Sequence, residues 1–418
     1  MIENPKIEQL PKDWKLVKLG DTIDIQGGSQ PPKSDFIYQP KEGYIQLLQI
    51  RDFGDKGVPT YVPIKKVTKF CKKDDIMIAR YGASLGRIIT GLEGAYNVAL
   101  AKVIDENKLF EKRYIFYLLK TQIFQTPLKL LSRSAQNGFS KSELAHIELP
   151  LPPKPTQQDI VSKIEELLSE LDKGVEQLKT AQLQLKTYRQ AVLKWAFEGK
   201  LTNKNVKENE LPKEWRCINL GDYIEDISSG KSFRCNERPP QKDEVGIVKV
   251  SSVTWGFFDE SESKTCFTKD LLNTNYLIKQ GDFLFSRANT IELIGACVIV
   301  NKITNQLMLS DKILRFTFTK DVSKEFVLYY LRSRRGRKQI EALSTGNQDS
   351  MRNIGQVKVR QIQIPVCSTQ EQNKVVQEIE SRLSVADKMD GSITESLLQA
   401  ETLRQSILKK AFEGKLTS

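Results

Sequence analysis

The side chains best suited to chemistry in this sequence are basic and amide residues in glycine- and serine-rich loops that follow short apolar runs. Lysine and arginine bind phosphates, and Arg, Asn and Gln can also form paired hydrogen bonds with base edges. In the first half of the chain the candidates are Gln30, Lys33, Arg51, Arg80, Tyr81, Ser84, Arg133, Gln136 and Asn137. In the second half they are Lys231, Arg234, Arg238, Lys249, Ser251, Arg287, Asn289, Thr290, Arg334, Arg335, Asn347, Gln348 and Arg352. The set predicts DNA contacts, although each residue taken alone fits a solvated turn equally well.

Motifs of catalytic sites are missing from the sequence. The segment ISSGKSF resembles the end of a phosphate-binding loop, but Glu225 stands where the first glycine is required. There is no H-E-x-x-H, no glycine-rich dinucleotide or methyl-donor loop, and no N-P-P-[YF] stretch of a DNA adenine methyltransferase. Asp74 and Asp75 beside two lysines could form a nuclease cluster, but they are more typical of a solvated turn. We therefore expect no catalytic residue, cofactor or metal ion in this chain.

Cysteine and histidine are too few and too scattered for a metal or nucleophilic site. The six cysteines form no C-x-x-C pair, so reduced, structural thiols are expected. The single histidine, His146, excludes any site within the chain that needs two imidazoles. We expect a structural role for it.

Charge and length limit the class of protein. With 64 basic and 52 acidic side chains the net charge is +12, which favours polyanions because bound counterions are released when cations bind DNA or RNA. Ribosomal or acidic-membrane partners also fit that charge. A chain of 418 residues is long enough for two domains. No apolar run reaches membrane-spanning length and the first residues lack a secretory signal, so a cytoplasmic protein is expected.

The sequence repeats itself, and the repeat indicates which elements position the loops. QAVLKWAFEGKLT matches QSILKKAFEGKLT at the end of the chain, with Phe197 against Phe412, at an offset of 215 residues. Upstream and without a gap, Gln157, Ile164, Glu165, Leu168 and Asp172 align with Gln372, Ile379, Glu380, Leu383 and Asp387. LPKDWKLVKLGD near the start matches LPKEWRCINLGD in the middle. Since further matches between them keep the same order, the whole half is duplicated.

Each half divides into a globular part and a helical part. Residues 1–152 and 203–366 mix short apolar runs with Gly, Pro and Ser turns, which predicts α+β domains. Residues 153–202 and 367–418 repeat apolar residues at helical spacing, which predicts one long helix in each.

The spacing within the helical parts predicts a coiled coil. In the second helix apolar residues follow alternating steps of three and four, the seam of a left-handed coiled coil. They are Ile379, Leu383, Ala386, Ile393, Leu397, Ala400, Ile407 and Ala411, interrupted by Asp390 and Arg404. The first helix has Ile164, Leu167, Leu171, Val175, Leu178, Leu185, Tyr188 and Val192 on a similar stripe. The alternative is a helix lying on its own domain, but a rod of about 60 Å is longer than such a domain is wide.

The repeated tail indicates that the helices pair antiparallel. In that arrangement AFEGKLT at 411–417 lies beside LPKDW, just as AFEGKLT at 196–202 precedes LPKEW. Gly199 and Gly414 stand where a helix end favours left-handed backbone. A parallel pair would leave the repeat unexplained. The expected fold is therefore α+β, with two globular domains, an antiparallel coiled coil and pseudo-twofold internal symmetry.

This order of segments resembles the specificity subunit of type I restriction-modification systems over essentially the whole chain. The resemblance rests on LPKDW…LGD, a PLPP-x-x-x-Q entrance to the helix and the AFEGKLT exit. The chain departs from the usual Glu-Gln entrance at Thr156, and the second half has Val366, Cys367 and Ser368 where prolines are common. The resemblance implies two target recognition domains, no catalytic activity, two methyltransferase subunits docked on the helices, and restriction subunits that join for cleavage. It also implies that S-adenosylmethionine, ATP and Mg²⁺ are used by the partner subunits.

Two reading domains at the ends of a rod predict a bipartite DNA target. Half-sites on one face of B-DNA lie about 34 to 36 Å apart, and the domains differ in sequence, so we expect unequal half-sites around an unread gap. Arg80 and Arg287 share a repeat position and rank first among the candidates. Arg334 and Arg335 belong to a basic run found in the second half alone, and fit phosphate contact or a solvated helix end equally well. The alternatives are a stand-alone DNA methyltransferase or nuclease, and a coiled-coil scaffold that binds nucleic acid without sequence preference.

Overall fold

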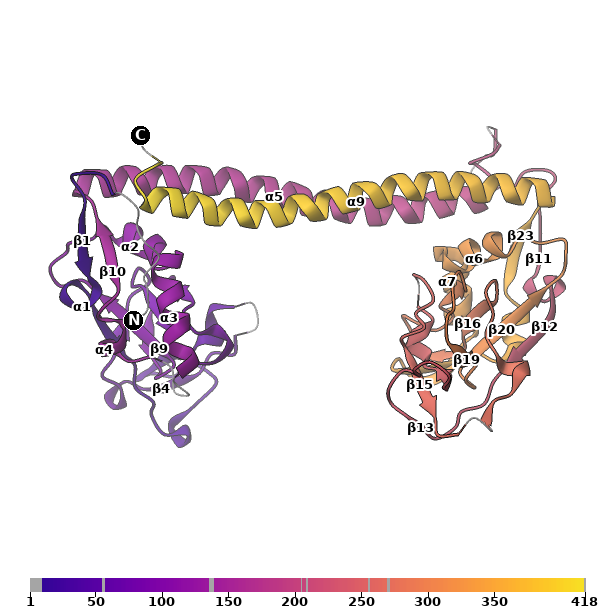
Figure 1. The fold of residues 1–418 in the computed structure, drawn as a ribbon, viewed down its shortest axis with the longest axis horizontal. Coiled ribbons are helices and arrows are strands. Elements are labelled where there is room, and N and C mark those ends of the chain that lie inside the picture. The colour runs from indigo at the N-terminus through magenta and orange to yellow at the C-terminus, as the bar shows by residue number, and fades with distance from the viewer. Residues whose placement is uncertain are drawn as a thin grey trace. The chain divides into compact units, whose positions relative to one another are not determined.

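The structure is a computed structural model that describes residues 10–54, 57–134, 139–203, 205–207, 210–254, 256–268 and 271–416, without the side chains of 132–134. The chain forms two compact units. Unit 1 consists of Met1–Leu178 and Glu395–Ser418, and unit 2 of Lys179–Thr394. Each unit therefore contains one globular domain together with part of each long helix (Figure 1).

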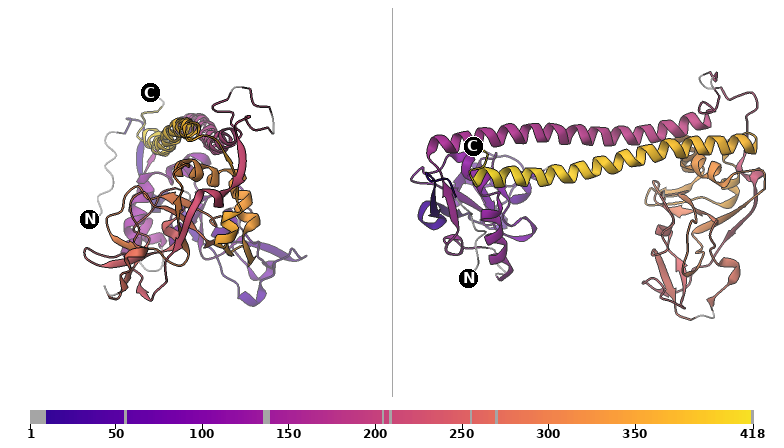
Figure 2. Two further views of the ribbon diagram at one scale, coloured as in Figure 1. Left: turned by 90° about the vertical axis from the view of Figure 1, so that its right-hand side faces the viewer. Right: turned by 45° about the horizontal axis from the view of Figure 1, so that its top comes forward.

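The two long helices pair within each unit. They are α5 (Lys154–Phe197) and α9 (Thr369–Phe412), each of 44 residues. In unit 2, Gln182 Nε2 donates to Asp390 Oδ1 at 3.2 Å, and Arg189 Nη2 donates to Asp387 Oδ1 at 2.8 Å. Along these contacts the residue numbers increase in α5 and decrease in α9, so the two helices run antiparallel. Figure 2 shows them side by side.

The seam expected from the sequence is covered. Every apolar position predicted for it is buried or half-buried. The two polar interruptions bond across the pair: Asp390 accepts from Gln182 in unit 2, and Arg404 forms an ion pair with Asp172 in unit 1. Polar residues in a seam help to specify its register. The antiparallel coiled coil is confirmed, and the interruptions help to align it.

The domain of unit 1 is built from short strands and helices. Its strands are β1 (Lys15–Lys18), β2 (Asp24–Gly27), β3 (Tyr44–Leu48), β4 (Tyr61–Pro63), β5 (Phe70–Cys71), β6 (Met77–Ala79), β7 (Ile88–Ile89), β8 (Gly94–Tyr96), β9 (Leu100–Ile104) and β10 (Glu148–Leu151). Its helices are α1 (Leu19–Thr22), α2 (Lys112–Leu118), α3 (Gln122–Ser134) and α4 (Lys141–Leu144). β1 pairs with β10, and two four-stranded sheets have the orders β2-β9-β6-β7 and β4-β3-β8-β5.

The domain of unit 2 repeats this plan. Its strands are β11 (Arg216–Asn219), β12 (Ile224–Ser229), β13 (Cys235–Asn236), β14 (Val245–Val248), β15 (Ser263–Cys266), β16 (Phe283–Ser286), β17 (Ala288–Asn289), β18 (Cys297–Ile299), β19 (Gln306–Met308), β20 (Ile313–Phe318), β21 (Thr345–Gln348), β22 (Met351–Asn353) and β23 (Gln363–Val366). Its helices are α6 (Lys324–Arg332), α7 (Arg334–Leu343) and α8 (Gln356–Arg360). β11 pairs with β23, and the sheets are β12-β20-β16-β18, β13-β15-β14-β19 and β17-β22-β21.

Strand pairing supports the duplication and the expected α+β class. β1–β10 and β11–β23 are equivalent antiparallel pairs. In each pair, the first strand of the domain is bonded to the last strand of the same domain. β3 pairs parallel with β8, and β14 pairs parallel with β19 in the same way. Short strands that pair antiparallel with close neighbours are consistent with the glycine- and proline-rich turns of the sequence.

A buried glutamine fixes the start of α5 to the domain of unit 1. Gln157 Oε1 accepts from the backbone N–H of Glu111 at 2.6 Å. Its Nε2 donates to the carbonyls of Leu109 and Pro152 at 3.1 and 2.9 Å. Glu111 is the N-cap of α2. One fully buried side chain therefore holds the helix entrance and the start of α2 together.

Gln372 makes the same bonds at the start of α9. Its Oε1 accepts from the N–H of Ser323, the N-cap of α6, at 2.9 Å. Its Nε2 donates to the carbonyls of Asp321 and Cys367 at 3.3 and 3.0 Å. Because both glutamines are fully buried, losing either would leave backbone groups without partners. The glutamine, rather than the residue before it, makes the contacts that the two entrances share.

The repeated tail closes each helix onto the start of a domain. Gly199 and Gly414 have φ of +75° and +72°. A Cβ on Gly199 would lie 2.4 Å from Pro212 Cγ, and one on Gly414 would lie 2.4 Å from Pro11 Cγ. Left-handed backbone and close approach both require glycine here. The expectation that the tail lies beside LPKDW, as the middle segment lies beside LPKEW, is confirmed within each unit for the described residues, which in the tail end at Leu416.

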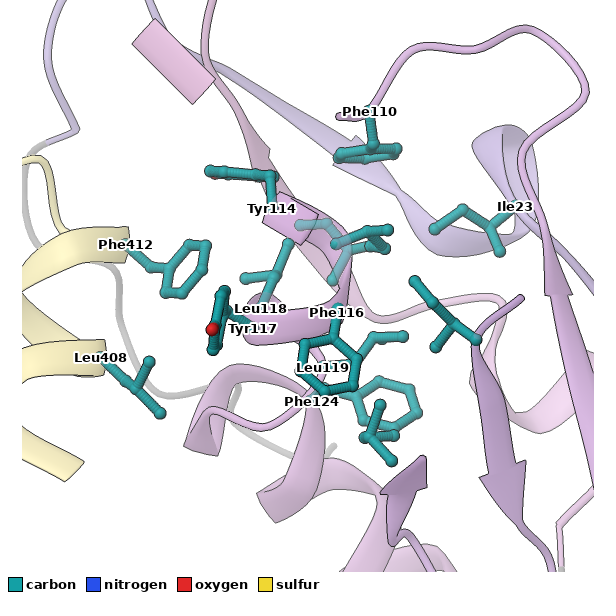
Figure 3. Close-up of a cluster of buried hydrophobic side chains, with 14 of the residues drawn as sticks. Ile23, Phe110, Tyr114, Phe116, Tyr117, Leu118, Leu119, Phe124, Leu408 and Phe412 are labelled. Atoms are coloured by element: carbon teal, nitrogen blue, oxygen red, sulfur yellow. The ribbon is translucent and has the colours of Figure 1, made fainter. Parts of the chain in front are cut away.

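Aromatic side chains pack each helix end against its domain. Figure 3 shows Phe412 and Leu408 of α9 pointing toward the aromatic side chains of α2. The rings of Tyr114 and Phe412 lie 5.0 Å apart at 66°. In unit 2 the rings of Phe326 and Phe197 lie 5.1 Å apart at 75°. Edge-to-face pairs of this kind contribute about 1 kcal/mol beyond the area that they bury.

Candidate nucleic-acid interface

Arg80 follows β6 and is largely committed to its own domain. Its guanidinium donates to the carbonyls of Phe139 and Val98 at 3.2 and 3.5 Å. It also lies 5.3 Å from the ring centroid of Tyr81, within cation–π range. The side chain is half-buried and tied to the segment before α4.

Arg287 occupies the equivalent place after β16 but is less tightly held. The backbone N–H of Arg80 donates to Ala99, and that of Arg287 donates to Lys312, at 2.9 and 3.0 Å. Arg287 Nη2 reaches Asn353 Oδ1 at 3.4 Å, and its Nε is buried without a hydrogen-bond partner among the described residues. The Arg287 guanidinium thus makes fewer hydrogen bonds within its domain than that of Arg80 does.

A β-ribbon made by β21 and β22 adjoins Arg287. β17, which follows Arg287 directly, pairs with β22, and β22 pairs with β21. Arg352 Nη1 donates to Gly346 O at 2.8 Å, while its Nη2 donates to Ser344 O and Oγ, both at 2.9 Å. Arg352 therefore stabilises the ribbon, and its donors are spent within the protein.

The outer residues of the ribbon are exposed. Asn347 and Gln348 lie on β21 with exposed side chains, and Met351 on β22 is 73% exposed. The major groove of B-DNA admits a two-stranded ribbon, and Asn or Gln can pair with adenine there. Among the candidate loops within the described residues, this ribbon has the shape and side chains that best fit base readout.

The other candidates of unit 2 divide into bonded and free side chains. Arg238 forms a two-pronged ion pair with Glu244, each contact 2.7 Å, and this hydrogen bonding lowers the pKa of Glu244 to about 2. Ser251 donates to Glu262. The N–H of Thr290 donates to Asn289 Oδ1 at 2.9 Å, and both residues are half-exposed. Lys231 and Arg234 have exposed side chains, and Lys249 is half-exposed.

The remaining candidates of unit 1 lie on loops at the strand ends. Gln30 and Lys33 are exposed, while Tyr81 and Ser84 are half-exposed. Arg51 is exposed and donates to Thr60 Oγ1 at 3.1 Å. The side chain of Arg133, and the whole of Gln136 and Asn137, lie outside the described residues.

The two arginines of the basic run lie against a long helix. Arg334 and Arg335 are exposed in the first turn of α7, whose N-cap is Ser333. Together with Lys338 they line a cavity of about 490 Å³ whose opposite wall is α5, including Gln190. Arg332 and Arg337 of the same run hold the domain together through backbone carbonyls. The excess charge thus faces a helix rather than the ribbon.

The glycine and aspartate motifs that resemble catalytic loops have structural roles. A Cβ on Gly230 would lie 1.7 Å from Leu309 O, so this glycine permits a close backbone approach. Asp74 pairs with Lys112 at 2.6 Å, and Asp75 pairs with Lys102 at 2.7 Å, as expected of a turn. His146 is exposed, so it does not belong to the core. No group of three or more His, Cys, Asp or Glu in the described part of the chain could hold a metal ion.

Comparison with known proteins identifies what the chain is similar to. The sequence model of the family described as type I restriction modification DNA specificity domain matches residues 11–180. The specificity subunit of the type I restriction enzyme EcoKI from Escherichia coli K12 is 25% identical over 430 residues, covering 98% of this chain and 90% of the relative. That of MjaVIII from Methanocaldococcus jannaschii is 26% identical over 421 residues, covering 98% and 94%.

Solved structures share the fold. One is a chain from a study of complex assembly and conformational transition in a type I R-M system, with a TM-score of 0.75 at 17% identity, covering 97% of this chain and 99% of that chain. Another is the HsdS subunit from Thermoanaerobacter tengcongensis, with a TM-score of 0.58 at 17% identity, covering 99% and 100%. Within the described residues no helix has the length and apolarity to span a membrane.

Proposed function

We infer that this chain belongs to the specificity subunits of type I restriction-modification systems, and that it recognises a DNA sequence without catalysing a reaction itself. The observation that carries this inference is similarity over 98% of the chain to two such subunits. The duplicated helix junctions support it, because a doubled reader needs the same attachment twice. We also propose a cytoplasmic location, since the function requires access to DNA.

We propose that residues 1–152 and 203–366 are target recognition domains for two different half-sites. The glutamine, glycine and aromatic contacts that attach each domain to the helices are the same in both units. The loops at the strand ends differ, since Arg80 is bonded within its domain while Arg287 adjoins an exposed ribbon. The two domains are attached to the helices by the same contacts, but their loops differ. Together these features favour a bipartite DNA target with two unequal half-sites.

Within unit 2 the ribbon is the proposed base-reading element. Asn347 and Gln348 are suited to adenine, and Arg287 is suited to guanine. Lys231 and Arg234, which are exposed, are proposed to contact phosphates and to set affinity more than sequence preference. Arg352 supports the ribbon through its bonds to Gly346 and Ser344.

The long helices are proposed to dock two methyltransferase subunits. Leu183 on α5 and Leu398 on α9 are related by the 215-residue offset, and they are 64% and 69% exposed. A shallow hollow beside Leu183 is lined by Thr180, Gln184 and Tyr188. Exposed apolar residues at matching positions fit one docking surface used twice. S-adenosylmethionine would then be bound by those partners, and ATP and Mg²⁺ by restriction subunits.

Purified chain, alone and with the methyltransferase subunit of the same source, tests this function. The chain is incubated with DNA, Mg²⁺ and labelled S-adenosylmethionine, and methyl transfer is measured. We expect no transfer by the chain alone, and transfer to specific sequences by the mixture. Transfer by the chain alone would overturn the assignment, and so would transfer by the mixture without sequence preference.

A further inference from the structure

A basic pocket lies in unit 1 where the domain meets the helical pair. The cavity has a volume of about 390 Å³ and is lined by α2, α5 and α9. Its polar lining includes Arg113, Lys120, Arg404, Gln405 and Ser169. None of the candidate DNA-reading residues lines it.

The pocket holds more positive charge than its carboxylates can neutralise. Glu165 is paired with Arg113 at 2.6 Å, and Asp172 is paired with Arg404. Lys120 forms no ion pair with any carboxylate in the described part of the chain, and its Nζ lies 3.9 Å from the ring centroid of Phe116. Both acids of the lining are thus occupied by arginines, and the ammonium group of Lys120 has no carboxylate partner among the described residues.

The surroundings of Lys120 disfavour its charged form. Burial, followed by the charges of Arg113, Arg404 and Arg87, lowers the pKa of Lys120 to about 8. The other charged or titratable groups at the pocket are Tyr117 on α2, the two paired acids on α5, and Glu401 on α9, whose Oε2 lies 4.0 Å from Arg404 Nε. A site where cations repel one another and disfavour protonation is one that a bound anion would relieve.

The equivalent surface of unit 2 lacks this surplus. Glu325 stands where unit 1 has Arg113, and Arg332 stands where it has Lys120. The Arg332 guanidinium donates to the carbonyls of Cys297 and Gly256, each at 2.8 Å, so its donors are engaged. The repeat preserves the arginine–aspartate pair, here Arg189 with Asp387, but Glu325 puts a negative charge where unit 1 has the Arg113 guanidinium. At this position of the repeat, surplus positive charge is thus found in unit 1 and not in unit 2.

We propose that this pocket binds a phosphate dianion, either free or as the terminal group of a small molecule. Lys120 supplies the charge, while Arg113 and Arg404 retain N–H donors beyond those used on their carboxylates. A dianion matches the unpaired ammonium together with the neighbouring Arg87. The cavity exceeds the size of one phosphate, which leaves room for an attached group.

Calorimetric titration of the full chain with inorganic phosphate at pH 8.5 tests the proposal. Bound dianion favours the ammonium form, so binding takes up roughly 0.5 to 0.8 proton, seen as heat that changes with the ionisation enthalpy of the buffer. Adenosine monophosphate serves as the second probe. Tighter binding of the nucleotide by tenfold or more assigns the pocket to a phosphoryl group on a small molecule, and equal or weaker binding assigns it to free phosphate.

Variants distinguish phosphate binding in this pocket from non-specific attraction to the positive charge of the chain. Lys120→Met is expected to weaken phosphate binding at least tenfold, and Lys120→Arg to keep binding but lose the proton uptake. Arg113→Glu copies unit 2 and is expected to lose binding. Lys186→Met, at an exposed lysine of α5, is the control and leaves binding unchanged.

Three results would overturn the proposal. They are no phosphate heat at millimolar concentration, equal affinity of the wild type and Lys120→Met, and binding without proton uptake. Circular dichroism confirms that each variant is folded. DNA sequence preference is measured in parallel and is expected to be intact in Lys120→Met, so the outcome here is independent of the proposed function.

Discussion

The junctions of unit 1 and unit 2 are alike in their contacts, whereas the loops at the strand ends are not. Gln157 and Gln372 bond to equivalent N-caps and carbonyls, and Gly199 and Gly414 approach equivalent prolines at the same 2.4 Å. At the strand ends, Arg80 is bonded into its domain, while the buried Nε of its counterpart Arg287 has no partner among the described residues. The two halves are therefore alike at the junctions that attach the domains to the helices. They differ in the loops that are proposed to contact DNA.

The difference assigns separate roles to the two kinds of region. A junction must satisfy buried backbone groups, so few side chains can replace the one present. A loop on the surface has no such constraint and can change its side chains at little cost in stability. Substitutions at the junctions should therefore reduce stability equally in both units, whereas substitutions in the loops should affect the DNA preference of one unit only.

The largest expected effect comes from the buried glutamines. Gln157→Ala and Gln372→Ala each leave one N–H and two carbonyls without partners, and each is expected to lower the free energy of unfolding by about 3 kcal/mol. Urea denaturation of the full chain measures the loss. Gln190→Ala and Gln405→Ala, at exposed glutamines of the same helices, are the controls and change little. A large loss in one unit with none in the other would break the equivalence of the junctions.

Helix α9 offers a matched pair of glycine substitutions, one just beyond its C-terminal end and one in its interior. Gly414→Ala places a Cβ at positive φ and against Pro11, and is expected to destabilise the chain by about 2 kcal/mol. Gly391→Ala lies within the same helix with open space around it, and is expected to stabilise by up to about 1 kcal/mol. Thermal unfolding of the two variants measures both changes. If the two shifted stability in the same direction, the contact of the tail with LPKDW would not be the reason for the glycine.

Arg287→Ala sharpens the contrast between the loops. It is expected to reduce discrimination at one half-site by about 1 to 2 kcal/mol, because one base contact is lost. Competition between cognate and single-mismatch duplexes, in the presence of the methyltransferase subunit, measures it. Mismatches in the other half-site serve as the control and are expected to be rejected as before. Equal loss at both half-sites would indicate that Arg287 contributes to folding or to phosphate binding instead.

A smaller expected effect is a difference between the two units in how stability depends on pH. Lys120 has a pKa of about 8 in the folded chain against an ordinary value of 10.5, so below pH 8 it is protonated in both folded and unfolded states. Between pH 8 and 10.5 the unfolded chain holds the proton more tightly, so stability rises with pH across that window. Urea midpoints of the wild type relative to Lys120→Met should therefore increase from pH 8 to 10. The matching comparison with Arg332→Met should show no such trend, because arginine does not titrate there, and parallel curves for both pairs would contradict the pKa difference.

Much of the helical framework could be predicted from the sequence. The residues that align between the halves, such as Asp172 with Asp387, proved to be those that bond the helices to each other or to the domains. Such positions repeat because both copies meet the same physical requirement. Heptad spacing and the position of Gly414 sufficed to predict an antiparallel pair.

The candidate site was less predictable, because the fate of a polar side chain depends on partners far away in the sequence. Arg238 and Arg352 looked like Arg234 in the sequence, yet Glu244 and the carbonyls of Gly346 and Ser344 occupy their donors. The ribbon was missed because TGNQDSMRN contains short polar stretches with no alternating apolar pattern. Met351 was missed for the same reason, since an exposed methionine leaves no periodic signal.

The most direct measurement is selection of bound duplexes from a library of randomised DNA, using the full chain with its methyltransferase subunit. For the wild type we predict two blocks of preferred bases separated by a gap without preference. For a variant carrying Asn347→Ala and Gln348→Ala, we predict that preference disappears from one block and is unchanged in the other. A single continuous block in the wild type would contradict separate reading by the two domains, as would a variant that alters both blocks or neither.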